Sequence, residues 1–325
     1  MRAPACGFLL AVMALGCGDR GEKAAGKELP KVRVTFSPHI SWGPLMIAQA
    51  EGFFRDEGVE VEFVPALRTE EATVALATGD IDVRVGQVMG GFLSAVAHGA
   101  RIRITAGQGY LDPKGCTYYG IVLRPGLDTA GTPPIKRMRV SQDGMSRYVA
   151  SRMLSNRHVS LNTIETNRLP ESVMAMSLES GAIDAVAATE PTLSRLVKIG
   201  KLWLSAQDVL PDFQWGVLAF SERLVFREPD TGIRFLKGYN RGVARFREGK
   251  TERNVAIIAE ETGETPEVIR EACWPSFRAD SRINWESIAE FQAWANVEGL
   301  MERTVSRNQV WDSTFVTAIA KPSHP

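Results

Sequence analysis

Between residues 32 and 64, the spacing of polar and apolar residues changes from that of a strand to that of a helix and back to that of a strand. The rest of the chain repeats this pattern. Val32–Phe36 reads as a strand, Ser37–Gly43 as a loop, and Pro44 opens a helix. Residues 59–63 then alternate as a second strand. Between the strands, apolar residues recur at helical spacing at Met46, Ala50, Phe53 and Phe54.

This order of elements places polar side chains at the edge of a sheet. A strand, a helix and a strand in this order form a right-handed parallel crossover. Ligands bind beyond the carboxyl ends of the strands in such sheets. Ser37, His39 and Trp42 follow the first strand directly, so they are expected at the mouth of a binding site.

The alternation of strands and helices continues to residue 220. Strands are expected at 81–85, 102–106, 118–123, 139–141, 163–166, 183–187 and 212–220, and helices at 70–78, 89–97, 146–155, 170–179 and 191–199. The remainder is helical, at 232–248, 252–262, 266–273 and 285–298. Its apolar stripes predict packing faces rather than a cofactor site, as at Phe235, Tyr239, Val243 and Phe246.

Two segments divide the chain into lobes. Asp112–Gly115 interrupts the alternation and predicts a crossing into a second lobe, and the strand at 212–220 predicts the return. The first lobe is therefore expected to comprise residues 31–111 and 212–325, and the second residues 112–211. The alternation is typical of α/β lobes built on mostly parallel sheets.

One internal echo supports two similar lobes. Leu76-Ala-Thr-Gly-Asp-Ile-Asp82-Val recurs as Leu178-Glu-Ser-Gly-Ala-Ile-Asp184-Ala. Both read as a helix end, a glycine after the helix, a short turn and a buried strand. A common origin and a common way of leaving a helix both explain the echo, and both fit the fold.

The first 17 residues differ from the rest of the chain. Arg2 precedes the apolar run Phe8–Leu15, and Gly16 precedes Cys17. This order is typical of a secretory signal with a lipoprotein-like cleavage site, and it predicts lipidation of Cys17 and a periplasmic or extracytoplasmic protein anchored to a membrane. Ordinary signal cleavage and an uncleaved anchor are the alternatives. Residues 18–30 are expected to form a flexible tether.

Composition and charge exclude several classes of function. The formal net charge is zero, which argues against nucleic acid as a partner. Beyond the signal segment the cysteines are Cys116 and Cys273, and their spacing leaves open whether they form a disulfide. The four histidines are scattered and no Cys/His cluster has the spacing of metal ligands. Neither a metal nor a cofactor is expected.

The stretch from Trp42 to Val61 resembles the start of ABC-transporter substrate-binding proteins of the nitrate/sulfonate/taurine and thiamine-pyrimidine-precursor family. The match rests on the run Ala48-x-x-x-Gly52-Phe53-Phe54 followed by Glu57-Gly58-Val59. It extends over residues 32–221, and the C-terminal part agrees in general character. The resemblance implies the type II periplasmic-binding-protein fold, with two lobes joined by two hinge crossings that close on a ligand.

The same resemblance implies a binding protein and not an enzyme. It would capture a small solute outside the inner membrane and deliver it to the permease and ATPase subunits of an ABC importer. We expect a monomer. Two enzyme groups that share the fold, thiamine-pyrimidine synthases and a menaquinone-pathway lyase, remain alternatives, although the clustered cysteines of the synthases are missing and the signal segment argues against both. A ligand sensor for a membrane receptor would have the same sequence features.

Strand ends of the two lobes supply the expected ligand-binding residues. Trp42 is expected to stack on a planar ligand or to seal its loop, and His39 to contact ligand or to cap backbone groups. Asp143 and Ser146 lie where a strand leads into a helix, so they either accompany N–H groups that bind anions or cap the helix. The predicted set is Ser37, His39, Trp42, Gln87, Gln108, Tyr110, Ser141, Asp143, Ser146, Glu190, Gln214 and Trp215.

These residues favour a nitrogen heterocycle, such as a thiamine, pyrimidine or flavin precursor, over a sulfonate or nitrate-like anion. Glu190 would accept a charge-assisted bond from an N–H of the ligand and repel an anion, or it would instead offset the helix dipole at Pro191. Arg147 is the single cation expected nearby. Helix N-termini near Ser146 keep the anion as the second interpretation.

Overall fold

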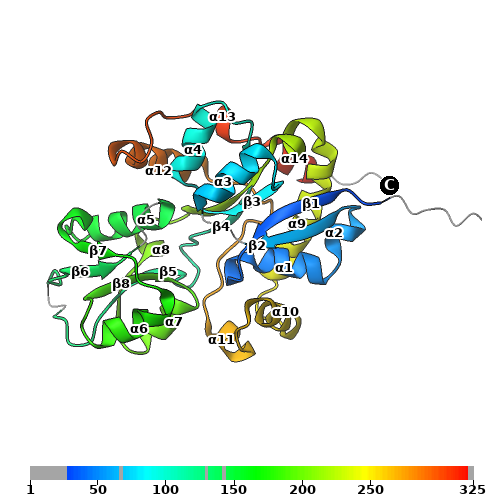
Figure 1. Cartoon of the computed structure of the whole chain (residues 1–325). Helices are drawn as coiled ribbons and strands as arrows, with labels where there is room; N and C mark the ends of the chain where they lie inside the picture. Colours follow the sequence, from blue (N-terminus) through cyan, green and yellow to red (C-terminus); the bar gives the residue numbers. More distant parts are fainter. Residues whose placement is uncertain (1–27, 66–68, 129–130, 141–143, 321–325) are drawn as a thin grey trace, which may run out of the picture.

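The structure is a computed structural model, and we describe residues 28–65, 69–128, 131–140 and 144–320. Two five-stranded sheets, each flanked by helices, form two lobes (Figure 1). The expected two-lobed α/β fold is therefore confirmed. The predicted signal segment, Cys17 and most of the tether lie outside the described residues.

Lobe 1 is built on the sheet with the strand order β2-β1-β3-β10-β4. Its strands are β1 (Lys31–Phe36), β2 (Glu60–Pro65), β3 (Val83–Gly86), β4 (Arg103–Tyr110) and β10 (Gln214–Phe220). Its helices are η1 (Ile40–Trp42), α1 (Gly43–Ala50), α2 (Phe53–Asp56), α3 (Thr69–Thr78), α4 (Gly90–Ala97), η3 (Arg223–Arg227), α9 (Pro229–Arg247), α10 (Glu252–Thr262), α11 (Pro266–Glu271), α12 (Trp285–Val297), α13 (Arg307–Val310) and α14 (Thr314–Ala320).

Lobe 2 is built on the sheet with the order β7-β6-β8-β5-β9. Its strands are β5 (Tyr119–Leu123), β6 (Arg137–Arg139), β7 (Glu165–Asn167), β8 (Ala185–Thr189) and β9 (Lys201–Ser205). Its helices are α5 (Gly144–Ser155), η2 (Leu161–Thr163), α6 (Glu171–Glu179), α7 (Thr192–Val197) and α8 (Ala206–Val209).

The two sheets have matching topologies. In lobe 1, β1 pairs in parallel with β2 and β3, and β10 runs antiparallel between β3 and β4. In lobe 2, β6 pairs in parallel with β7 and β8, and β5 runs antiparallel between β8 and β9. In each lobe the antiparallel strand is the one by which the chain arrives from the other lobe. The rest of each sheet is parallel, so its carboxyl ends face the space between the lobes.

The sequence echo has the same local structure in both lobes. The backbone N–H of Asp82 donates to the carbonyl of Arg33 over 2.8 Å, and that of Asp184 donates to the carbonyl of Arg137 over the same distance. Arg33 and Arg137 in turn donate to the carbonyls of the glycines that end α3 and α6. The two motifs therefore start equivalent strands, β3 and β8.

One hydrophobic core runs through both lobes, and a smaller cluster fills the outer face of the lobe 2 sheet. The predicted stripe on α9 lies entirely in the large core, which confirms its packing role. The smaller cluster consists of residues from β5, β8, α6 and α7, together with Ile183. Lobe 1 also carries α9 to α14, so it is the larger framework of the two (Figure 1).

Several local expectations were wrong. The helix that follows Pro44 is broken in two, because Gly52 adopts φ 74° between α1 and α2. Ala50 is exposed as a result and does not join the buried face. Seven short elements were not anticipated: η1, η2, η3, β9, α8, α13 and α14.

A disulfide joins Cys116 to Cys273, with their Cα atoms 5.7 Å apart. Cys116 lies in the crossing that leaves β4 for lobe 2, and Cys273 follows α11 of lobe 1. The pairing that the spacing left open is therefore present. No helix in the described part of the chain is long and apolar enough to span a bilayer.

Candidate functional site

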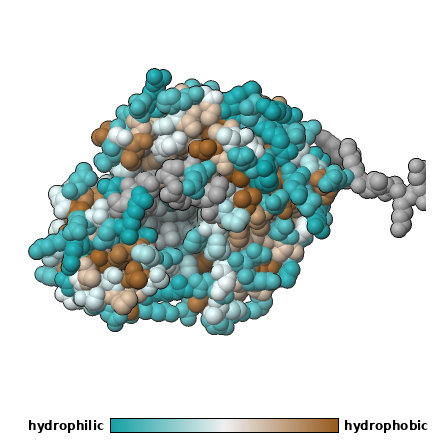
Figure 2. All heavy atoms as spheres, viewed as in Figure 1, coloured by the Kyte–Doolittle hydropathy of each residue, from teal (hydrophilic) through white to brown (hydrophobic). Residues whose placement is uncertain are grey.

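A cavity of about 340 Å³ lies between the lobes, at the carboxyl ends of the parallel strands. The surface is visibly hollowed there (Figure 2). Lobe 1 supplies most of the wall through the ends of β1, β3 and β4 and the loop after β1. The lining residues include Thr35, Ser37, His39, Ser41, Trp42, Arg84, Gly86, Gln87, Met89, Gln108, Tyr118, Ser146, Thr189 and Trp215.

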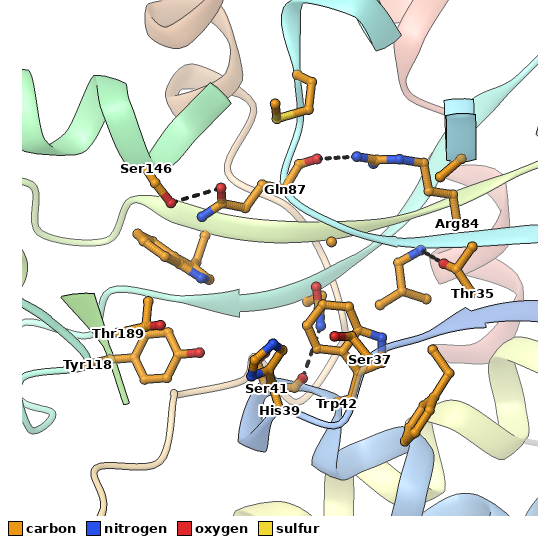
Figure 3. A pocket seen from close by; sticks show the side chains of 17 residues that line it. Thr35, Ser37, His39, Ser41, Trp42, Arg84, Gln87, Tyr118, Ser146 and Thr189 are labelled. Atoms are coloured by element: carbon orange, nitrogen blue, oxygen red, sulfur yellow. Dashed lines mark hydrogen bonds between the residues drawn. The ribbon is translucent and has the colours of Figure 1, made fainter. Parts of the chain in front are cut away.

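Trp42 forms one wall because a short 3-10 turn and Pro44 fix the chain just after it. Its ring reaches the backbone of Gly86 at the end of β3, and the ring of His39 lies 6.0 Å away at a tilt of 49° (Figure 3). The indole Nε1 of Trp42 is buried and has no hydrogen-bond partner in the described part of the chain. A buried donor of this kind favours a ligand that brings an acceptor.

Lobe 2 reaches the same cavity through the start of α5. Ser146 Oγ donates to Gln87 Oε1 over 3.0 Å and so connects the two lobes across the cavity (Figure 3). Tyr119 holds this turn in place, since its hydroxyl donates to the Ser146 carbonyl. Beside it, a Cβ on Gly144 would overlap the sulfur of Met89, and φ is 68° at this glycine. The lobes therefore touch closely at this edge of the cavity.

The polar floor of the cavity is ordered by internal hydrogen bonds. Gln108 Nε2 donates to the carbonyl of Ser41 over 3.0 Å, and Arg84 donates to the carbonyl of Gln87 over 2.9 Å. Burial raises the pKa of Tyr118 to about 12, although a hydrogen bond with Ser41 opposes the rise. Its phenol therefore stays protonated. Trp215 packs against this ring edge-to-face at 5.7 Å.

A second chamber of about 390 Å³ lies beside the first, mainly within lobe 2. The two share His39, Ser146 and Thr189. The other residues of this chamber come from the ends of β5, β6 and β8 and from the start of α6: Tyr119, Arg139, Leu169, Pro170, Glu171, Met174 and Ala188.

The structure brings seven of the predicted residues together around the first cavity. They are Ser37, His39, Trp42, Gln87, Gln108, Ser146 and Trp215. Ser141, Asp143 and Cys17 lie outside the described residues. The structure places the remaining three, Tyr110, Glu190 and Gln214, away from this cavity.

Glu190 caps a helix instead of facing the cavity. Its carboxylate accepts from the hydroxyl and the backbone N–H of Ser194 at the start of α7, and from the backbone N–H of Cys273. Burial raises the pKa of Glu190, although these hydrogen bonds oppose the rise. The alternative role beside the helix dipole is thus the one that the geometry supports.

Gln214 and Tyr110 also have structural partners. Gln214 is 1% exposed; its amide donates to the carbonyls of Gly109 and Gly216 and accepts from the N–H of Asn284, so its groups are used within the fold. Tyr110 points to another surface, where its hydroxyl donates to Asp112 and the guanidinium of Arg278 lies 4.2 Å from the ring centroid.

Sequence reasoning missed two cations of the site. Arg84 lines the first cavity and Arg139 the second, whereas Arg147, the expected cation, lines neither. The signal was present in the alternation of the strands, because Arg139 lies two residues before Ser141 and β6 ends at the sheet edge where ligands bind. Tyr118, just before β5, and Thr189, the last residue of β8, also line the first cavity and were missed, although both lie at strand ends.

No group of three His, Cys, Asp or Glu side chains among the described residues is placed to hold a metal ion.

Comparison with known proteins agrees with the fold. A family model described as NMT1/THI5 like matches residues 40–108. No curated protein sequence matches the chain.

Solved structures of similar shape have low sequence identity. The ligand-binding component of an ABC-type import system from Staphylococcus aureus has a TM-score of 0.70 at 13% identity, over 89% of this chain and 98% of that one. The periplasmic aliphatic sulphonate binding protein SsuA from Escherichia coli has 0.69 at 17% identity, over 88% and 93%. The desulfurization enzyme DSZB has 0.65 at 14% identity, over 90% and 99%. These likenesses establish the two-lobed fold of periplasmic binding proteins.

Proposed function

We propose that this chain is the extracytoplasmic solute-binding protein of an ABC importer. The observation that carries the proposal is the cavity whose walls come from both lobes and whose edge is closed by the bond between Ser146 and Gln87. Such a site can close on a ligand when the lobes approach each other and release it when they separate, which suits capture and release. Two proteins of similar fold, a ligand-binding component of an import system and a sulphonate-binding protein, support this class.

The proposal includes lobes that move as bodies, with residues 31–111 and 212–325 in one and 112–211 in the other. The hydrophobic core is continuous through both lobes, and ion pairs at the cleft supply a second kind of contact between them. Arg195 of α7 pairs with Glu264 beyond α10 over 2.6 Å, and Lys198 pairs with Glu271 over 2.8 Å. Contacts of this kind can be exchanged for water when the cleft opens.

The chemistry of the first cavity favours a small solute that carries hydrogen-bond acceptors and a planar or apolar body. The free indole N–H of Trp42 and the hydroxyls of Ser37 and Tyr118 are available as donors. A heterocycle with ring nitrogens or carbonyl groups fits this description, and so does an organic oxyanion. The sequence favoured a heterocycle with amino donors because Glu190 was expected to accept from them, but Glu190 lies outside the cavity. The proposal therefore rests on hydrogen-bond acceptors of the ligand.

We propose binding without covalent chemistry. The described cysteines are joined in a disulfide outside the cavity. The His39 ring makes no hydrogen bond with another side chain in the described part of the chain, so no nucleophile is paired with a base there. The similarity to DSZB makes an enzyme the second candidate, and the test below separates the two.

The location outside the cytoplasm and the lipid anchor at Cys17 belong to the same proposal. Cys116 and Cys273 form a disulfide across 157 positions of the chain. Structural disulfides are typical of proteins in oxidising compartments. Labelling with palmitate tests the anchor: the wild-type chain should incorporate label and Cys17→Ser should not. Equal labelling of both, or none of either, would remove the anchor from the proposal.

A ligand screen tests the main proposal. Mature protein would be heated with organic sulfonates, nitrate, aminopyrimidines and flavin precursors, since a ligand at 100 times its Kd adds about 2.7 kcal/mol of stability. Trp42→Ala should lose most of the affinity, and Trp42→Phe should keep the stacking but lose the donor. The bound compound should be recovered unchanged. Recovery of a product would favour the enzyme, and unaltered binding by Trp42→Ala would place the site elsewhere.

A further inference from the structure

We propose that the lobe 2 chamber binds an acidic end group of the solute, with the guanidinium of Arg139 as its counter-ion. This inference rests on the proposed function and names the ligand class more closely: an organic acid with its body beside Trp42 and its oxyanion in lobe 2. Neither end alone would fill the two adjacent chambers, which share His39, Ser146 and Thr189.

The position of Arg139 supports this role. It is the last residue of β6, at the carboxyl end of a parallel strand, and its side chain lines the chamber. Nη1 donates to the carbonyl of Ala187 over 3.2 Å, which fixes the guanidinium against β8. Nε is buried without a hydrogen-bond partner in the described part of the chain. Buried donors are almost always satisfied, so a group that the structure lacks is expected to accept from this one.

The charges around Arg139 point to an anion. Burial lowers the pKa of Arg139, so its positive charge is poorly solvated, while Tyr119 and Glu171 oppose the shift. Glu171 is the one acidic residue among the described residues that line the chamber, but it is exposed and already accepts from the hydroxyl of Thr192 over 2.5 Å. In the described part of the chain no ion pair joins the two. A planar oxyanion would supply both charge and acceptors to a guanidinium.

The size and walls of the chamber argue for an organic acid and against a simple inorganic ion. The chambers measure about 340 and 390 Å³, and ligand sites of about 300–1,000 Å³ hold organic molecules. Leu169, Pro170 and Met174 line the second chamber with apolar surface. Nitrate would leave most of this surface in contact with water. A molecule with an apolar or planar body and an acidic end would cover it.

Matched pairs of acid and neutral probes test the proposal by calorimetry. The pairs are benzenesulfonate and benzenesulfonamide, butane-1-sulfonate and butane-1-sulfonamide, and benzoate and benzamide. Each pair keeps its skeleton and differs in charge. Wild type should bind at least one acid ten-fold or more tightly than its neutral partner. That preference should shrink as sodium chloride rises, because salt screens the ion pair.

Four variants test whether Arg139 causes this preference. Arg139→Gln should weaken the acid at least ten-fold and leave the neutral partner within two-fold, and Arg139→Lys should retain part of the preference. Arg137→Gln, which removes the same charge from the same strand outside both chambers, should behave as wild type. Leu169→Trp, which fills the chamber from its loop, should weaken acid binding at least five-fold. Melting temperatures with and without probe confirm that each variant folds.

The outcomes separate this inference from the proposed function. An unchanged preference for acids in Arg139→Gln, or unchanged acid binding in Leu169→Trp, would overturn the inference. Binding of neutral heterocycles alone, dependent on Trp42, would overturn it while the proposed function stands. If wild type binds neither the acids nor any heterocycle of the screen, both fail.

Discussion

Each lobe contains a buried aspartate that accepts hydrogen bonds from the backbone of a neighbouring strand. The side chains that bind to these two aspartates differ between the lobes. In lobe 1, Asp82 accepts from the backbone N–H of Arg33 over 2.8 Å, and in lobe 2, Asp184 accepts from the N–H groups of Lys136 and Arg137 over 2.9 and 3.0 Å. Each carboxylate therefore holds the start of a neighbouring parallel strand, β1 or β6.

The partners from the antiparallel strands show the difference. Arg223, just after β10, donates to Asp82 over 3.0 Å and also pairs with Glu228 and bonds the carbonyl of Lys31. The side chain of Arg124, just after β5, donates to Asp184 over 3.0 Å, and its other described side-chain bond goes to the carbonyl of the adjacent Pro125. Both sites thus connect three stretches of their lobe, and the lobe 1 site has the additional bonds from Arg223 to Glu228 and Lys31.

This difference indicates how the chain divides its tasks. Lobe 1 is assembled from two distant stretches of chain, so a buried ionic site that joins them stabilises the lobe as a whole. Lobe 2 is one continuous stretch and needs no such connection. We infer that lobe 1 is the more stable framework and that lobe 2 opens first, and the four predictions below test this contrast.

The largest effect is expected from loss of the disulfide. Cys116→Ser with Cys273→Ser removes a link across 157 positions, which the chain-entropy model values at about 5 kcal/mol. The variant should unfold in two calorimetric transitions, with lobe 2 melting first, because the covalent connection between the crossing and the α11 segment is lost. Wild type treated with reductant is the control. A single transition at the wild-type temperature would contradict a coupling role for this bond.

The two aspartates form the most direct comparison. Asp82→Asn breaks a side chain that is 2% exposed and bonded to two arginines, so urea unfolding should show a loss of about 3–5 kcal/mol. Asp184→Asn keeps the local backbone bonds in part, and its side chain is 9% exposed, so about 1–3 kcal/mol is expected. Equal losses would mean that the extra partners of Asp82 contribute nothing.

Acid should weaken lobe 2 through Asp184. Burial opposes ionisation of this carboxyl, but hydrogen bonds from Arg137, Lys136 and Arg124 outweigh it and lower its pKa. A lowered folded pKa contributes stability above the ordinary value of about 3.9, and this is lost as the pH falls through the folded pKa. The free energy of unfolding of wild type should therefore fall below pH ~4. Asp184→Asn should show a shallower fall, and a parallel one would refute the assignment.

The smallest effect is expected at the ion pair between the lobes. Arg195 and Glu264 are 49% and 29% exposed, so a double-mutant cycle with alanine should give a coupling of about 0.2–1 kcal/mol. The effect on shape should be clearer than that on stability. Small-angle scattering without ligand should show a larger radius of gyration for the double variant, and unchanged scattering would mean that other contacts hold the lobes together.

The alternation between strand-like and helix-like spacing of apolar residues was enough to predict most of the fold. Strands of three to eight residues with apolar spacing, from β1 to β8, lie within a few positions of their expected places. The segment Lys201–Ser205 was not recognised as β9, because its burial is set by pairing with β5, which local spacing does not reveal. The break at Gly52 needed knowledge of a left-handed φ, which glycine permits but does not require.

The site was predicted less well than the fold. The loop after β1 was correctly expected at the cavity because parallel strand ends face it. Glu190 could serve either as a ligand contact or as a cap, and the deciding partners, Ser194 and the N–H of Cys273, become visible only when the chain is folded. Arg139 was missed because an arginine on a strand is ordinarily solvent-exposed, and its burial depends on Ala187 and the walls of the chamber.

The disulfide has one more consequence, for cleaved forms of the molecule. Cys116 and Cys273 close a covalent ring that contains the whole of lobe 2 and the return path through α9 and α10. A single proteolytic cut anywhere inside this ring leaves the two pieces of chain attached to each other. A nicked molecule would therefore migrate as one species in a denaturing gel until its disulfide is reduced. The two pieces of chain would also stay close enough to refold together.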